Sequence, residues 1–190
     1  MARIMFIVDS DFEDSEFRVP YDRVKQAGHE AVIVGLEAGK QLKGKKGKET
    51  ITAEKSVKDV SVDQFDALVI PGGYSPDHLR MDSGMVSLVR SFFQQGKPVA
   101  AICHAGWMLA EADIADGRTL TSWPSIKTDL INAGAHWVDR EVVEDGNLIT
   151  SRKPDDLKAF CDALLRQIDQ GISSRISEGA GVEAERPLVH

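Results

Sequence analysis

The chain has 190 residues, enough for one domain with a sizeable hydrophobic core. Its 30 acidic residues outnumber its 23 basic ones, and the net charge of −7 argues for a soluble protein and against nucleic acid as the main partner. No apolar run approaches the roughly 18 residues that a membrane span needs, and the first residues have no small-residue cleavage site, so neither a membrane partner nor a signal peptide is expected.

Strands and helices alternate along the first half of the chain. Continuous apolar runs predict buried strands, and the segments between them that end at glycine predict helices. Pro20 predicts a kink or a delayed start of the first helix, and residues 39–58, rich in lysine and glycine, predict a hairpin on the surface. In chain order we expect a strand over 4–8, a helix over 15–27, strands over 30–36 and 65–70, a helix over 83–95 and a strand over 99–102.

The second half continues the alternation. This pattern predicts a doubly wound α/β sandwich with a mostly parallel central sheet, forming one domain over residues 1–171. Residues 172–190 are small and polar without periodicity, which predicts a mobile tail or an arm that docks on a neighbouring subunit. Before that tail we expect a helix over 105–111, a strand over 118–121, a helix over 125–132, a β-hairpin over 141–150 and a last helix over 154–170.

Cys103 lies where a buried strand stops and a short helix is expected to begin. A nucleophilic side chain at such a turn is typical of a nucleophile elbow. The N–H groups of the new helix point at whatever the side chain attacks, and the helix dipole favours an anion, so we expect a lowered pKa for this thiol. The alternative is a small buried hydrophobe, as most free cysteines are. Cys161 fits that alternative because it lies in the apolar stripe of the last helix.

Loops with complementary chemistry converge on one edge of the predicted sheet. The carboxyl ends of parallel strands meet there, which brings together residues 9–14, 71–75 and 103–106. A thiol, a Gly-Gly turn and acidic side chains in one place are what a covalent hydrolase or lyase needs. We therefore favour a reactive role for Cys103.

Other motifs are incomplete. Residues 39–46 nearly match a phosphate-binding loop, but Lys46 replaces the Ser or Thr that would hold Mg²⁺, so these lysines are expected to be solvated. The scattered histidines lack metal-ligand spacing, and no Gly-x-Gly-x-x-Gly is present, so neither a metal nor another cofactor is expected. The two cysteines form no disulfide framework, which predicts a reducing, cytoplasmic setting.

Six segments of the chain together form a recognisable pattern: 12–16 followed by Pro20, 66–73, 101–104, 121–124, 132–135 and 142–154. In this order and at this spacing, they resemble the ThiJ/PfpI superfamily and within it the intracellular protease I branch. The resemblance covers about residues 3–170 and implies a flavodoxin-like three-layer sandwich, a nucleophilic cysteine at Cys103 and an acidic partner at Glu16. It also implies homodimers or larger rings and a stress-protective role, with peptidase, glyoxalase and deglycase activities claimed for members.

The resemblance also implies a peptidase triad. In the family it joins the cysteine and the histidine to a glutamate after the Pro-Gly-Gly turn, contributed by a neighbouring subunit. The matching positions are Cys103, His104 and Asp77. The aspartate side chain is shorter than the family's glutamate, so Asp77 would have to reach further. The side chains of adjacent residues in a strand or a helix point in different directions, so only a strained elbow brings the His104 ring to the Cys103 sulfur. The alternative is that His104 has a packing or interface role.

Glu16 raises a question of charge, because an ionised carboxylate beside a thiolate would repel it and raise both pKa values. We therefore expect a protonated Glu16 that donates a hydrogen bond to the sulfur and stores a proton. The alternatives are a solvated helix glutamate, or Glu13 in its place if the register is off. Gly72 and Gly73 are expected to form a turn with positive φ, where an N–H joins that of Ala105 in holding an oxyanion.

Three hypotheses of function remain open. In the first, the Cys103 thiolate attacks a small reactive carbonyl, Glu16 shuttles a proton, and a hydroxy acid is released. In the second, the same site cleaves peptides with His104 and with Asp77 of a neighbouring subunit. In the third, the protein is no enzyme but a redox sensor or chaperone in which Cys103 is oxidised.

Overall fold

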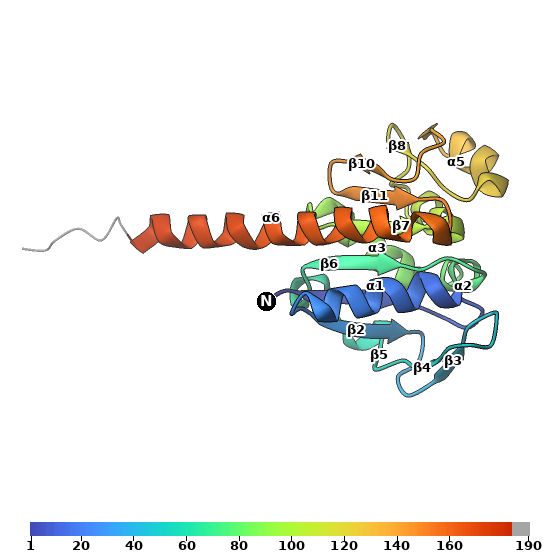
Figure 1. The fold of residues 1–190 in the computed structure, drawn as a ribbon, viewed down its shortest axis with the longest axis horizontal. Helices are drawn as coiled ribbons and strands as arrows, with labels where there is room; N and C mark the ends of the chain where they lie inside the picture. The colour runs from blue at the N-terminus through green and yellow to red at the C-terminus, as the bar shows by residue number, and fades with distance from the viewer. Residues whose placement is uncertain (184–190) are drawn as a thin grey trace, which may run out of the picture.

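The structure is a computed structural model that describes residues 1–183, with side chains up to residue 174. A seven-stranded sheet runs through its centre, in the order β10-β11-β7-β6-β1-β2-β5 (Figure 1). All neighbouring strands are parallel except β10 and β11, which form a hairpin. The strands are β1 (Arg3–Ile7), β2 (Glu30–Gly35), β5 (Lys55–Ser56), β6 (Ala67–Ile70), β7 (Val99–Ile102), β10 (Val143–Asp145) and β11 (Leu148–Ser151).

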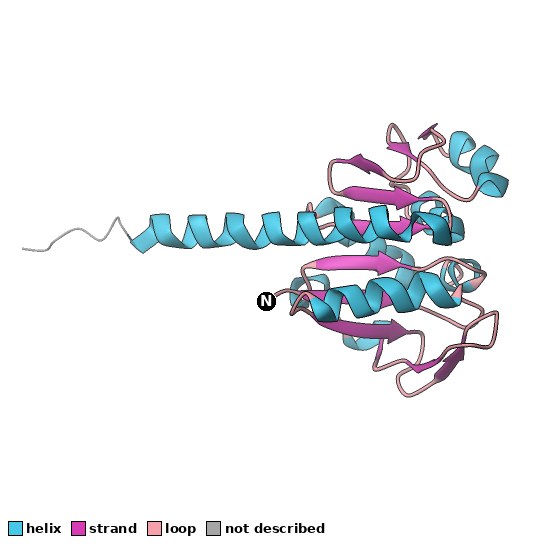
Figure 2. Cartoon of the chain, viewed as in Figure 1, coloured by secondary structure: helices cyan, strands magenta, loops and turns pink. Residues whose placement is uncertain are grey.

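Helices cover both faces of this sheet (Figure 2). The side chains of β1 alternate between the two faces, so Phe6 packs in one core and Met5 in the other. The core around Phe6 is closed by α1 (Asp14–Gln26) and α6 (Leu157–Glu183), and the predicted three-layer α/β sandwich is confirmed. The core around Met5 is closed by α2 (Ser75–Leu79), α3 (Ser83–Gln94), α4 (Gly106–Glu111) and α5 (Lys127–Asn132).

Smaller elements fill the connections. The hairpin predicted within residues 39–58 is confirmed as the antiparallel pair β3 (Gln41–Lys43) and β4 (Thr50–Thr52). A parallel pair, β8 (Thr119–Leu120) and β9 (His136–Trp137), includes a strand that the sequence does not predict. Short 3₁₀ turns are η1 (Val57–Asp59), η2 (Val62–Gln64), η3 (Cys103–Ala105), η4 (Pro124–Ile126) and η5 (Pro154–Asp156).

Two helices differ from expectation. Helix α1 begins at Asp14 with Pro20 inside it, so the predicted delayed start is wrong. Helix α6 was expected to end near residue 170 but continues to Glu183, and Figure 1 shows it extending well past the edge of the sheet. Residues 171–183 contain three glycines but no proline, and glycine weakens a helix without removing a backbone hydrogen bond. The tail beyond 183 lies outside the described residues, and a docking role for 172–190 stays a prediction. Among the described residues no helix is long and apolar enough to cross a bilayer.

The chain order places a crevice at one edge of the sheet. The chain passes from β1 to β2 and then returns to the other side of β1 as β6, so the loops after β1 and β6 diverge. Backbone hydrogen bonds nonetheless tie these loops together. The N–H of Glu13 donates to the carbonyl of Gly72 (3.1 Å), and the N–H of Tyr74 donates to the carbonyl of Asp11 (2.8 Å). The predicted meeting of loops at this edge is confirmed.

Candidate active site

Cys103 stands on a strained corner between β7 and α4. Its φ is +63°, in the left-handed region that non-glycine residues rarely adopt, at a cost on the order of 1 kcal/mol. The 3₁₀ turn η3 starts at this residue and leads into α4. The carbonyl of Cys103 accepts a hydrogen bond from the N–H of Trp123 (3.3 Å), which helps to hold the corner. The sharp elbow that the sequence predicts at Cys103 is therefore present.

Glu16 reaches the sulfur from the first turn of α1 and is fully buried. Its Oε2 accepts a hydrogen bond from the N–H of Gly72 (2.9 Å). Its Oε1 is buried without a hydrogen-bond partner among the described residues, and the carboxyl group lies beside the Cys103 thiol. Burial, followed by the charge of Glu13, raises the pKa of Glu16 to about 8. The carboxyl is therefore mostly protonated at neutral pH, the state that the sequence argument predicts.

The predicted lowering of the Cys103 pKa is wrong for the resting site. Burial raises the pKa of this thiol to about 12, and the charge of an ionised Glu16 contributes in the same direction. The N–H groups of His104 and Gly73 point at the sulfur and lower its pKa, but they do not outweigh burial. The surrounding loops bury the side chain of Cys103, so its sulfur is largely shielded from solvent. At neutral pH the protonated Glu16 adds no charge repulsion, so burial is the main cause that remains.

His104 is brought to the sulfur by the strained corner. Its Nδ1 lies 3.4 Å from Sγ of Cys103, and its Nε2 lies 3.3 Å from Oγ of Ser125. The ring also packs against Trp107, with 4.9 Å between ring centroids. Burial, followed by the positive charge of Lys45, lowers the pKa of His104. The imidazole is therefore neutral at neutral pH and has a nitrogen that can accept a proton.

The Gly-Gly turn serves the site in two different ways. Gly73 has a φ of +77°, as predicted, and an added Cβ would collide with the backbone of residues 11–13. Gly72 is not among the residues with positive φ, so that part of the prediction is wrong. It is required because its missing side chain leaves the space that Glu16 and Cys103 occupy.

Replacing Gly72 with alanine is expected to destabilise the protein by about 2 kcal/mol and to disturb the sulfur, because the new methyl group has no space. It would lie 2.7 Å from Cβ of Cys103 and 2.8 Å from the carbonyl oxygen of Ile102, and closer still to Glu16. Urea unfolding measures the loss of stability. The control is Gly171→Ala on α6, where the added methyl group meets nothing within 4 Å. Equal stability of the two variants would contradict this packing argument.

Lys45 and Lys46 enter the site, although the sequence predicts them as solvated. Nζ of Lys45 lies 2.8 Å from Oε2 of Glu13, and Nζ of Lys46 lies 2.7 Å from Oε1 of the same buried carboxylate. These ion pairs keep the pKa of Glu13 low against the effect of its burial, which by itself would raise it. One feature of the sequence could have predicted that these lysines lie at the site. The hairpin that carries them follows β2, whose carboxyl end lies at the same sheet edge as the ends of β1 and β6.

These groups surround one cavity of about 370 Å³. Asp77 is exposed on α2 and does not line it, so its role through a neighbouring subunit stays a prediction. Ala105 is buried beneath the elbow and does not line it either; the N–H groups that reach the sulfur belong to Gly73 and His104. The lining residues are Glu13, Glu16, Lys45, Lys46, Tyr74, Cys103, His104, Trp123 and Pro154.

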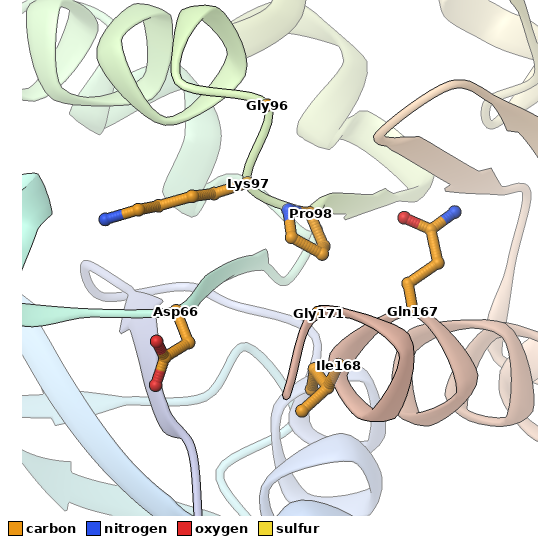
Figure 3. A pocket seen from close by; sticks show the side chains of 7 residues that line it. All are labelled: Asp66, Gly96, Lys97, Pro98, Gln167, Ile168 and Gly171. Atoms are coloured by element: carbon orange, nitrogen blue, oxygen red, sulfur yellow. The ribbon is translucent and has the colours of Figure 1, made fainter. Parts of the chain in front are cut away.

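A second cavity, of about 180 Å³, lies at the opposite edge of the sheet, before β6 and β7 (Figure 3). Its lining residues include Asp66, Lys97 and Gln167, and the ammonium group of Lys97 donates to the carbonyl of Val62 (2.8 Å). No cysteine, serine or threonine side chain lines it. In the part of the chain that the structure describes, no three His, Cys, Asp or Glu side chains are grouped to hold a metal ion. The cavity at Cys103 is therefore the candidate active site.

The fold and this site define an α/β sandwich protein with a cysteine elbow. The chain belongs to the DJ-1/PfpI family, whose sequence profile matches residues 2–167. It is 48% identical to "Protein/nucleic acid deglycase 2" of Escherichia coli over 165 residues, which are 86% of this chain and 96% of that protein. It is 45% identical to "Putative cysteine protease YraA" of Bacillus subtilis over 158 residues, which are 83% of this chain and 93% of that protein.

Solved structures agree with this assignment. Drosophila melanogaster DJ-1beta is 31% identical with a TM-score of 0.81, and the match covers 92% of this chain and 97% of that one. A two-domain protein from Anabaena variabilis has DJ-1/ThiJ/PfpI-like and ferritin-like domains. It is 38% identical with a TM-score of 0.88, and the match covers 89% of this chain and 48% of that one. The family that the sequence motifs resemble is thereby confirmed.

Proposed function

We propose that this protein is a cysteine-dependent enzyme that acts on small reactive carbonyls. Its substrate would be an α-oxoaldehyde such as methylglyoxal, or the early adduct of one on a protein side chain. One observation carries the proposal: the Cys103 thiol has a neutral imidazole 3.4 Å away and a protonated carboxyl group beside it. A base and an acid next to one nucleophile are what addition to a carbonyl requires. The deglycase name of the Escherichia coli relative supports the same substrate class.

The first step forms a bond between sulfur and the aldehyde carbon. Because burial keeps the pKa of the Cys103 thiol high, its proton passes to His104 as the bond forms, and no free thiolate accumulates. The electron pair of the carbonyl moves to oxygen, which takes the proton of Glu16. This assigns His104 the base role and Glu16 the acid role, with the product of the step a hemithioacetal.

The later steps return the site to its starting state. A proton moves from the first to the second carbon through an enediol, which oxidises the first carbon to a thioester and reduces the neighbouring ketone to an alcohol. Glu16, now ionised, is the group next to the sulfur that can carry this proton. Water then hydrolyses the thioester, releasing a hydroxy acid and the Cys103 thiol, and the proton held by His104 returns to Glu16. The sum is methylglyoxal plus water giving lactic acid, which is lactate and a proton at neutral pH.

A second candidate is a cysteine peptidase, which is favoured by the Cys103–His104 contact and by the name of the Bacillus subtilis relative. This reading needs an acidic third member, Asp77 of a neighbouring subunit, and therefore a homodimer or ring. A cavity of about 370 Å³ fits a three-carbon substrate more readily than an extended peptide. We therefore place the carbonyl reaction first.

Both activities can be measured in one purified preparation, fractionated by size. We expect lactate formation from methylglyoxal in every assembly state, because the groups of the proposed reaction come from one chain. Peptide cleavage would be confined to assembled fractions, because it needs Asp77 of a second subunit. Cleavage of peptides without any lactate formation would overturn the proposal and favour the peptidase.

A further inference from the structure

The charges in the cavity do not balance. Glu13 contributes one negative charge, and Lys45 and Lys46 contribute two positive ones in contact with it. Glu16 is mostly protonated at neutral pH, and Cys103 is a thiol at rest. The wall of the cavity around the sulfur therefore carries one positive charge in excess, inside a protein whose overall net charge is −7.

The two lysines are held in place by the fold. The carboxylate of Asp14, at the start of α1, accepts hydrogen bonds from the backbone N–H groups of Lys46, Lys48 and Glu49, each 2.9 Å long. The N–H of Lys45 donates to the carbonyl of Phe12 (2.9 Å), which ties the same loop to the segment after β1. The loop between β3 and β4 is thus clamped over the cavity. Such pre-organisation is what a binding site needs and a solvated hairpin does not.

The two lysines lie at different depths. The side chain of Lys45 is 35% exposed, and its pairing with Glu13 raises its pKa. The side chain of Lys46 is 53% exposed, so it faces the mouth of the cavity while its Nζ still reaches Glu13. An anion that enters from solvent meets the ammonium group of Lys46 first. Tyr74 and Trp123 supply exposed aromatic surface at the same mouth.

We infer that Lys46 makes this cavity selective for carbonyl compounds that also carry an anionic group, a carboxylate or a phosphate. The anionic group binds the ammonium of Lys46 at the mouth while the carbonyl carbon lies at Cys103. The identity of the reacting group rests on the proposed function, whereas the preference for an anion does not. The competing interpretation is that both lysines only neutralise Glu13, in which case charge on the ligand makes no difference.

Two alkylating reagents of nearly equal size separate these interpretations. Iodoacetate is anionic and iodoacetamide is neutral, and both alkylate the same sulfur. The ratio of their rates at Cys103 therefore cancels changes in the reactivity of the thiol itself. The measurement is made in a Cys161→Ala background by mass spectrometry, with glutathione as the reference thiol. The wild-type ratio is expected to exceed that of glutathione.

The variants are Lys46→Met, Lys46→Arg and the matched control Lys48→Met, which changes an exposed lysine of the same loop that does not line the cavity. Lys46→Met is expected to lower the ratio about threefold, the size of a partly exposed ion pair. Lys46→Arg and Lys48→Met are expected to keep the wild-type ratio. Salt at about 1 M should lower the wild-type ratio because it screens the charge. An unchanged ratio in Lys46→Met, with a wild-type melting temperature, overturns the inference.

A second experiment measures turnover. It compares methylglyoxal (2-oxopropanal), which is neutral, with its anionic 3-phosphooxy derivative. We expect kcat/KM to favour the phosphorylated compound in the wild type and to lose that preference in Lys46→Met. If the alkylation ratio responds as expected but neither carbonyl is converted, the anion site stands and the proposed function fails. If both carbonyls are converted and neither preference depends on Lys46, the proposed function stands and the anion site fails.

Discussion

Replacing Cys103 with alanine is expected to lower kcat for methylglyoxal by at least about a thousandfold, because the covalent route loses its nucleophile. No other thiol lines the cavity in the described part of the chain, and the neighbouring acid and base have nothing to activate. Cys103→Ser tests the same point with a smaller change in shape, since a hydroxyl group beside His104 is a much weaker nucleophile. Lactate released per enzyme, followed over hours, gives the measurement.

The matched control is Cys161→Ala. Cys161 lies on the buried face of α6, where burial raises the pKa of its thiol to about 11, and it does not line the cavity. Its replacement is expected to leave kcat unchanged. Wild-type turnover by a pure preparation of Cys103→Ala would remove the chemical basis of the proposed function, whatever the fold.

Replacing Glu16 with glutamine is expected to lower kcat about a hundredfold or more, the usual contribution of a positioned acid or base. Glutamine keeps an oxygen that can accept the hydrogen bond from the N–H of Gly72. It cannot give or take a proton, so the geometry is retained while the proton store is lost. An unchanged kcat in this variant would show that Glu16 is no proton carrier.

The same variant tests the protonation state through stability. The pKa of Glu16 is about 8 in the folded protein against an ordinary 4.5, so between these pH values the folded protein holds a proton that the unfolded chain has released. The contribution of Glu16 to the free energy of unfolding therefore falls as the pH rises, by about 4 kcal/mol between pH 4.5 and 8. Below pH 4.5 both states are protonated and Glu16 imposes no penalty.

Urea unfolding of the wild type and of Glu16→Gln at pH 5 and pH 8 measures this change, because the difference between the two proteins cancels other groups that titrate in this range, such as His104. The Glu16→Gln variant lacks the titrating group, so its stability should depend less steeply on pH than that of the wild type. Parallel pH profiles for the two proteins would mean that Glu16 is ionised in the folded state at neutral pH.

Much of the fold and part of the site could be predicted from local patterns. Apolar runs such as 4–8 and 99–102 identify strands, since a strand buried on both faces has no polar positions. The alternation of strands and helices then places the loop before Glu16 and the corner at Cys103 on one edge of the sheet. The protonation of Glu16 could be anticipated because two neighbouring acids do not both ionise readily.

The remaining features depend on contacts between distant segments. Lys45 and Lys46 reach Glu13 because Asp14 holds the backbone of their loop across more than 30 residues of chain. No local pattern contains that contact, and the lysine-rich composition suggests solvent exposure instead. The requirement for Gly72 is also a tertiary effect, since it arises from the space that the Glu16 carboxyl occupies.

The sequence by itself determined the order of strands and helices, the family and the position of the thiol at a strand–helix corner. These properties follow from hydrophobic periodicity and turn residues, which act between near neighbours in the chain. The tertiary structure alone decided the raised pKa of Cys103, the part that burial plays in the raised pKa of Glu16, and the excess positive charge of the lysine pair. Burial and Coulomb interactions set these quantities, and both depend on distances that only the folded chain defines.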